Sequence, residues 1–196
     1  MKKWIVPVII IILLAIWGFN VKNTSVVLNE DVKESWGNVQ NAYQRRNDLI
    51  GNLVNTVKGA ADFERGTLTD VIEARSKATQ TTIDPSNITP EQLKQFNQAQ
   101  GGLSSALSRL LVTVERYPDL KSNQNFLKLQ DELASTENSI QTQRTRYNEA
   151  IKPFNTYVNK APRSMLASML GYSEKPYFDS ETGADKPVDV EFDFSN

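Results

Sequence analysis

The sequence predicts an all-α fold in which an N-terminal transmembrane helix precedes an elongated antiparallel helical bundle. The bundle is expected to contain three long helices and one short C-terminal helix. Three observations predict this fold. Residues 4–21 form one apolar run, and no proline occurs between Pro7 and Pro85. Beyond the run, apolar residues recur at helical spacing over most of the chain.

Residues 4–21 are predicted to cross a membrane once, behind a short tail of residues 1–3. A helix of this length measures about 27 Å, close to a hydrocarbon core of about 30 Å. Trp4 and Trp17 lie near its two ends, where aromatic rings favour the headgroup region. A cleavable signal peptide is the alternative, but Trp17 stands where a cleavage site needs a small residue.

The charges around the span predict its orientation. Lys2 and Lys3 precede the span, and Lys22 and Lys33 follow it, but the free N-terminal amine adds a charge to the first side. Because positive charge is retained in the cytoplasm, this weak bias favours a cytoplasmic N terminus. The bulk of the chain would then lie on the outer side of the membrane.

Residues 22–172 are predicted to form the bundle. Its first helix follows a stripe that alternates four and three residues from Val32 to Ala78, which is about 70 Å of helix. An interior proline would cost about 3 kcal/mol, and none interrupts this stretch. Gly51, Gly59 and Gly66 mark points where the helix is expected to bend.

The second helix has a clear start and stop. Thr89 at an N-cap, Pro90 after it and Gln92 at the third position form a capping signal, and Pro118 ends the apolar stripe after Tyr117. The segment 117–119, Tyr117, Pro118 and Asp119, is interpreted as a helix stop and turn. A partner-docking loop is the alternative.

The third helix carries an apolar stripe from Phe126 to Val158, and Pro153 is expected to kink or divide it. A short amphipathic helix over 165–170 ends at Gly171. Residues 173–196 hold seven acidic side chains against two lysines and are predicted to form a solvated acidic tail. Within it, residues 188–194 alternate as a strand would, so that segment either pairs or stays mobile.

Composition excludes several kinds of function. The chain has 22 Lys and Arg against 23 Asp and Glu, so no basic surface for nucleic acid is expected. It has no cysteine and no histidine, which excludes thiolate nucleophiles, imidazole bases and Cys or His metal ligands. The carboxylates show no metal-loop spacing. We therefore expect no enzyme activity, no cofactor and no metal site.

Two sequence blocks resemble the LemA family: RRNDLIGNLV at 45–54 and ERYPDLK at 115–121. The resemblance begins at Trp36 and covers most of the chain. It implies a bacterial membrane protein with one N-terminal anchor and a helical body, a family linked to membrane organisation and to a neighbouring membrane zinc protease. Descriptions of the family place a short N terminus outside the cell, whereas the charge count above predicts the opposite. Phe63 precedes Glu64 where a histidine is common in the family, which argues against a metal role.

Several charged residues fall on the apolar stripes, among them Arg46, Glu137 and Arg144. Burying a charge without a partner costs several kcal/mol, so these residues should pair across helices or line a hydrated groove. A structural polar network is the leading interpretation, and a ligand groove near Glu137 and Arg144 is the alternative. The predicted network comprises Arg46, Glu64, Arg75, Glu115, Glu137, Asn138, Arg144, Tyr147 and Asn148.

The leading hypothesis for function is a single-pass scaffold or adaptor of the bacterial cell envelope, anchored in the cytoplasmic membrane. Its lipid contact is the span at 4–21, and its protein partner is expected to be a membrane protease or a second copy of the chain. Two alternatives remain. The helices could remodel the membrane directly, or the groove near Glu137 and Arg144 could sense a ligand.

Overall fold

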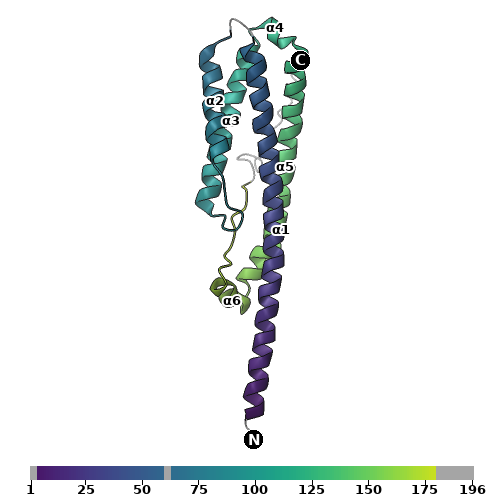
Figure 1. Cartoon of the computed structure of the whole chain (residues 1–196), viewed down its shortest axis with the longest axis vertical. Coiled ribbons are helices and arrows are strands. Elements are labelled where there is room, and N and C mark those ends of the chain that lie inside the picture. Colours follow the sequence, from purple (N-terminus) through teal and green to yellow (C-terminus); the bar gives the residue numbers. More distant parts are fainter. Residues whose placement is uncertain (1–3, 60–62, 180–196) are drawn as a thin grey trace, which may run out of the picture.

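The computed structural model describes residues 4–59 and 63–179. These residues form helices and irregular connections and contain no strand, which confirms the predicted all-α class (Figure 1). The helices are α1 (Ile5–Lys58), α2 (Arg65–Gln80), α3 (Pro90–Val114), α4 (Pro118–Lys121), α5 (Gln124–Asn159) and α6 (Arg163–Met169).

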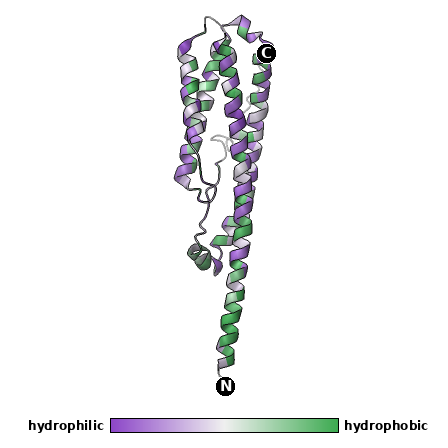
Figure 2. Ribbon diagram, in the orientation of Figure 1, coloured by the Kyte–Doolittle hydropathy of each residue, from purple (hydrophilic) through white to green (hydrophobic). Residues whose placement is uncertain are grey.

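The span and the first bundle helix are one continuous helix, α1, of 54 residues. Its apolar N-terminal part passes the length and hydropathy criteria for a membrane span. That part projects beyond the other helices and is the most hydrophobic part of the ribbon (Figures 1 and 2). From Val21 onward one face of α1 is buried in the bundle.

The first bundle helix is shorter than predicted. The stripe from Val32 to Ala78 is divided, because α1 ends at Lys58 with Gly59 as its C-cap and α2 begins at Arg65. In Figure 1, α2 runs back beside α1. Both halves still bury their apolar faces in one core, through Val57 and Val71 among others. Four long helices therefore form the bundle within the described residues, where three were expected.

The ends of α3 and α5 follow from local chemistry. The Thr89 hydroxyl accepts a hydrogen bond from the Gln92 amide at 3.2 Å, and the Gln92 side chain accepts one from the Thr89 amide at 3.0 Å, which confirms the capping box. In contrast, the expected division of the third helix is wrong. Helix α5 runs unbroken through Pro153 to Asn159, since packing on α1 outweighs the hydrogen bond that proline removes.

Two hydrophobic cores follow each other along the bundle. The first core lies toward α4 and includes Leu53 of α1, Leu103 of α3 and Leu133 of α5. The second core lies toward the span and includes Trp36 of α1 and Tyr147 of α5. Both cores draw on α1, α3 and α5, so one set of helices encloses both.

Residues 172–179, which we call the strap, return in extended form toward the middle of the bundle. The expectation that residues after 172 are solvated is wrong for this segment, because Lys175 and Phe178 are only 4% and 3% exposed. The sequence pattern could not show this, since the aromatic pocket that accepts Phe178 is built by other helices. Residues 180–196, including the alternating segment 188–194, lie outside the described residues.

Candidate functional site

A layer of polar side chains separates the two cores. Arg46 of α1, Gln100 and Ser104 of α3 and Glu137 of α5 form this polar layer. On each helix the layer residue lies within one turn of both cores, as Arg46 does between Tyr43 and Leu49. The polar layer therefore replaces the hydrophobic core at a single level of the bundle.

Arg46 is the centre of the polar layer. Its Nη1 donates to Glu137 Oε1 at 3.0 Å and to Ser104 Oγ at 3.2 Å, and its Nη2 donates to Gln100 Oε1. Its guanidinium also lies 5.0 Å from the ring centre of Tyr43. Arg46 is 3% exposed, whereas Glu137 keeps 46% of its side chain in solvent. The prediction that Arg46 and Glu137 pair across helices is confirmed.

A groove of about 320 Å³ opens beside the polar layer. Arg46 and Glu137 line it, together with Arg144 and Asp179. The Arg144 guanidinium donates to the Asp179 backbone carbonyl at 3.1 Å and lies 4.8 Å from the Phe178 ring centre. Two arginines and two acidic residues thus line one open groove. The structure brings together the residues named for a groove, and whether a ligand enters it stays a prediction.

Two asparagines of α5 hold the strap. Asn148 donates to the Phe178 carbonyl and accepts from the Phe178 amide, each at 2.9 Å. Asn155 makes the same pair with Lys175, at 2.8 and 2.9 Å. Seven helical residues rise about 10.5 Å and three extended residues about 10 Å, so the spacings match. Each asparagine side-chain amide therefore bonds the N–H and the carbonyl of one strap residue, as the backbone of a neighbouring strand would in a sheet.

Sequence reasoning named Asn148 but missed Asn155. The signal was present, because Asn155 follows Asn148 by seven residues, two helical turns, and so lies on the same side of α5. Lys175 was also missed, since it was counted as a charge of a solvated tail. Its ammonium donates to the carbonyls of Pro85 and Ser86, each at 3.2 Å, so the strap also holds the connection between α2 and α3. Burial lowers the pKa of Lys175.

Four aromatic rings close the second core around the strap. The Trp36 ring lies 5.5 Å from Phe96, 5.3 Å from Tyr147 and 5.8 Å from Phe178, measured between ring centres. Tyr147 is fully buried, and its hydroxyl lies 3.5 Å from the Pro176 carbonyl. The Tyr147 hydroxyl therefore makes only one long hydrogen bond in the predicted polar network, and the residue contributes mainly through the packing of its ring.

Four residues of the predicted network lie elsewhere, three of them at the surface. Glu64 precedes α2 and pairs with exposed Arg116 at 3.0 Å, because the break between α1 and α2 takes it off the buried stripe. Glu115 pairs at the surface with Lys121. Asn138 is exposed, since it lies on the outer face of α5.

Arg75 makes a contact apart from the polar layer. Its Nε donates to the backbone carbonyl of Asn47 at 2.7 Å and so joins α2 to α1. Its guanidinium covers Gly51, where a Cβ would come within 3.1 Å of it. Gly51 therefore allows this arginine to lie close to α1. The sequence predicted only a bend of the helix at Gly51.

The segment 117–119 follows a helix stop, as predicted, but Pro118 and Asp119 begin the short helix α4 where a turn was expected. Helix α3 ends at Val114, Pro118 opens α4, and the half-buried Tyr117 ring lies 4.9 Å from Phe63. Asp119 is exposed in the first turn of α4 and makes no side-chain cap there. Its part in docking a partner stays a prediction.

Burial of Tyr147 predicts a loss of stability in alkali. Burial raises the pKa of its hydroxyl above the ordinary value of about 10, so the folded chain keeps a proton that the unfolded chain releases. This contribution is complete below about pH 10 and is lost as pH rises toward the folded pKa. We expect Tyr147→Phe to flatten the fall in melting temperature above about pH 10, measured by circular dichroism in detergent.

Three other groups with shifted pKa values titrate in the same range, and the comparison of variant with wild type removes all three. The raised pKa values of Tyr43 and Lys33 act in the same direction, whereas the lowered pKa of Lys175 makes stability rise with pH up to about 10.5. All three are present in each chain. Equal alkaline losses in the wild type and in Tyr147→Phe would contradict the prediction.

No group of three or more Asp or Glu that could hold a metal ion occurs within residues 4–59 and 63–179. Of the ionisable groups around the groove, Arg46 and Glu137 form an ion pair, and Arg144 donates to the backbone carbonyl of Asp179. The arrangement can bind and hold helices in register, and it offers no activated nucleophile among these residues.

The chain is similar to a protein family and to several known proteins. A family model described as the LemA family matches residues 35–192. Magnetosome protein MamQ 2 of Paramagnetospirillum magneticum is 28% identical over 183 residues, which cover 85% of this chain and 67% of that protein. Magnetosome protein MamQ of Magnetospirillum gryphiswaldense is 26% identical over the same length and coverage. Protein LemA of Metamycoplasma hominis is 26% identical over 138 residues, 70% of this chain and 59% of that protein.

Proposed function

The chain belongs to the LemA family, and from that premise we propose that it is a single-pass membrane-anchored scaffold or adaptor of the bacterial cell envelope. In this proposal α1 binds lipid through residues 4–21, and the bundle presents surfaces to a protein partner. Its work is binding, without catalysis and without nucleic acid.

The continuity of α1 is the observation that supports this proposal. The exposed apolar turns and the buried stripe belong to one helix of 54 residues, about 81 Å long. Both hydrophobic cores hold the bundle part of that helix. A bundle joined to its anchor in this way is carried at a fixed height along the helix axis, which suits a protein that presents a surface to partners.

We propose that the chain lies in the cytoplasmic membrane with its bulk on the outer side, with Lys2 and Lys3 before the span kept in the cytoplasm. The absence of cysteine makes this testable with a single introduced thiol. Val112→Cys, at a side chain 71% exposed, should react in intact cells with a maleimide that does not cross membranes. Reaction only after lysis would contradict the orientation.

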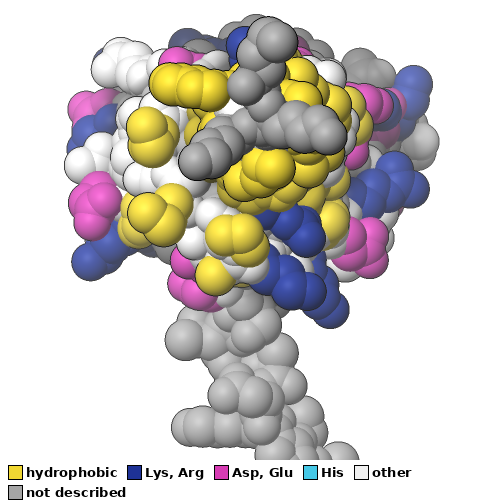
Figure 3. All heavy atoms as spheres, turned by 90° about the horizontal axis from the view of Figure 1, so that it is seen from below, with side chains coloured by type: hydrophobic (Ala, Val, Ile, Leu, Met, Phe, Trp, Pro, Cys, Tyr) yellow, Lys and Arg dark blue, Asp and Glu magenta, His cyan; other side chains and the backbone are white. Residues whose placement is uncertain are grey.

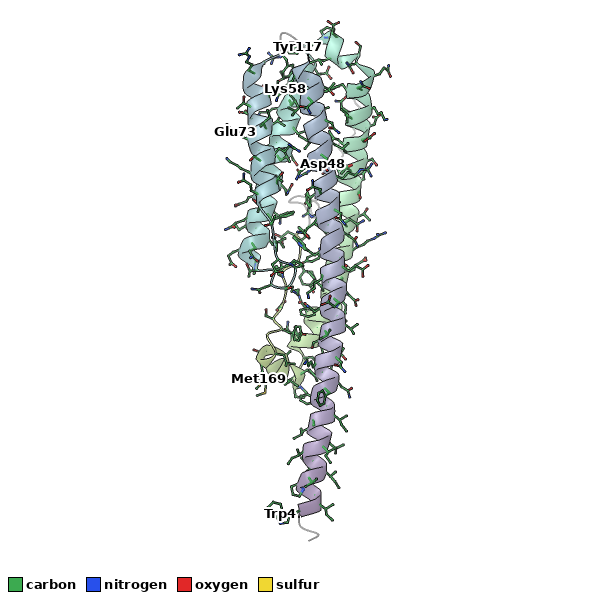
Figure 4. The ribbon with its side chains drawn as sticks, in the orientation of Figure 1. Trp4, Asp48, Lys58, Glu73, Tyr117 and Met169 are labelled. Carbon is green, nitrogen blue, oxygen red and sulfur yellow. The ribbon has the colours of Figure 1, made fainter. Side chains whose placement is uncertain are left out.

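The end of the bundle far from the span is the proposed contact surface. Tyr117 and Lys58 lie at this end, opposite Trp4 (Figure 4). Pro118 and Asp119 are exposed there beside the half-buried Tyr117. A membrane protease or a second copy of the chain is the proposed partner.

Crosslinking from Tyr117 tests the adaptor function. A photoreactive phenylalanine derivative replaces Tyr117 in the full chain in cells, and Tyr177, which is 41% exposed in the strap, serves as the matched aromatic control. We expect Tyr117 to capture one protein, identified by mass spectrometry, that Tyr177 does not capture. The same adducts from both positions, or none from either, would contradict an adaptor surface at this end.

A ligand sensor is a second candidate function, favoured by the groove beside the polar layer. Arg46 lines this groove, is 3% exposed, and its Nε has no hydrogen-bond partner among the described residues. A small polar ligand that raises the melting temperature of the wild type but not of Arg144→Gln would support it. Ligands that shift both chains equally would argue against this site.

A further inference from the structure

Helix α6 lies against α1 at the level where α1 leaves the bundle (Figure 1). Leu166 of α6 comes within 3.7 Å of the place where a Cβ on Gly18 would lie. Ala167 is fully buried in the second core, so α6 is fixed to the bundle as well as to α1. This short helix is the part of the bundle that reaches furthest toward the span.

The other face of α6 is apolar and uncovered. Met165 is 76% exposed, Met169 is 83% exposed and Leu170, just after the helix, is 39% exposed. Met165 and Met169 are four residues apart and so share one side of the helix. Figure 4 shows Met169 at the end of the bundle beside the bare part of α1. Scattered exposed apolar residues are ordinary, but these lie together at one level.

That level is set by the register between α6 and the span. Gly18 lies three residues before the end of the apolar run 4–21, which is about 4.5 Å of helix. If 4–21 crosses the bilayer, the contact with Leu166 falls at the edge of the hydrocarbon region. The exposed methionines of α6 therefore face the boundary between acyl chains and headgroups.

The surroundings of α6 fit the same boundary. The Arg163 guanidinium lies 4.7 Å from the Tyr157 ring centre. Lys160, shortly before α6, and Lys22, directly after the apolar run, are both exposed. Figure 3, which views the molecule from the span end, shows lysine and arginine side chains next to the hydrophobic surface. Basic and aromatic side chains beside an apolar face are typical of helices that lie in a membrane interface.

We propose that α6 is an interfacial helix whose Met165, Met169 and Leu170 insert into the lipid beside α1. The inference rests on the proposed membrane anchor and extends it, because it gives the bundle a second point of contact with the bilayer. One spanning helix alone leaves the bundle free to rotate about the helix axis. A second contact on one side of α1 directs a single face of the bundle toward the membrane.

Depth-dependent quenching of single introduced cysteines tests this. The full chain, labelled with an environment-sensitive fluorophore, is reconstituted in vesicles of phosphatidylcholine and phosphatidylglycerol that carry nitroxide lipids. Ile11→Cys reports the span and Met169→Cys reports α6. Val112→Cys, as exposed and apolar but at α3 near the far end, is the matched control. We expect the labels at 11 and 169 to be quenched by nitroxide lipid several-fold more than the label at 112, which aqueous iodide quenches most.

Each outcome decides between the two claims. A label at 11 quenched by lipid, with a label at 169 that behaves as the label at 112 does, overturns the interfacial helix and leaves the anchor intact. A label at 11 without lipid quenching overturns both. A label at 169 shielded from lipid and from iodide shows that protein covers this face and also overturns the inference.

Discussion

Replacing Trp36 with alanine is expected to lower the free energy of unfolding by about 3 to 5 kcal/mol. The Trp36 side chain is fully buried and packs on rings from α3, α5 and the strap. Its stacking on Phe178 is nearly parallel, with 14° between the ring planes. Alanine would leave a cavity that these separate segments could fill only by moving together.

Unfolding of the full chain in detergent, followed by circular dichroism, measures the Trp36→Ala effect. Trp17→Ala is the matched control, because Trp17 lies in the exposed apolar part of α1 and supports neither core. We expect the control to unfold as the wild type does. Equal behaviour of the two variants would contradict the central role assigned to Trp36.

Replacing Asn155 with alanine is expected to lower the free energy of unfolding by about 2 to 6 kcal/mol, from two buried polar groups left unpaired at about 1 to 3 kcal/mol each. The amide and carbonyl of Lys175 are bonded to Asn155, and Lys175 is 4% exposed. The variant should also release the strap locally. Hydrogen exchange of the Lys175 and Phe178 amides measures that release.

Asn159→Ala is the control for Asn155→Ala. Asn159 also belongs to α5 and also reaches the C-terminal segment, through a 3.0 Å bond to the exposed Glu174 carboxylate. Because solvent can replace that bond, its loss is expected to cost about 0.5 kcal/mol or less. Exchange protection of the strap that survives Asn155→Ala unchanged would show that the aromatic pocket alone holds it.

The polar layer gives the bundle one defined register. A slip of α5 by a turn against α1 would keep apolar residues opposed in both cores, but it would separate Glu137 from Arg46. The guanidinium, 3% exposed, would then lose its main charged partner, a cost of several kcal/mol. Buried polar groups fix register in coiled coils by the same means.

The sequence alone determined the features that depend on neighbouring residues. The apolar run at 4–21, the Thr89 cap and the helical period of α1, α3 and α5 are local patterns, and each was found. The sequence also predicted that Arg46 pairs across helices or lines a groove, because a charge on a buried stripe needs a partner, and the structure identified Glu137 as that partner.

Tertiary structure decided the rest. A helical stripe keeps its period whether the helix continues or folds back, so Gly59 predicted only a bend where α1 ends and the chain turns back into α2, and Glu64 moved to the surface with that break. The strap is buried because Trp36 and Tyr147 build its pocket and two asparagines of α5 satisfy its backbone. Those partners lie far away in the chain, and only folding brings them to the segment that the local charge pattern places in water.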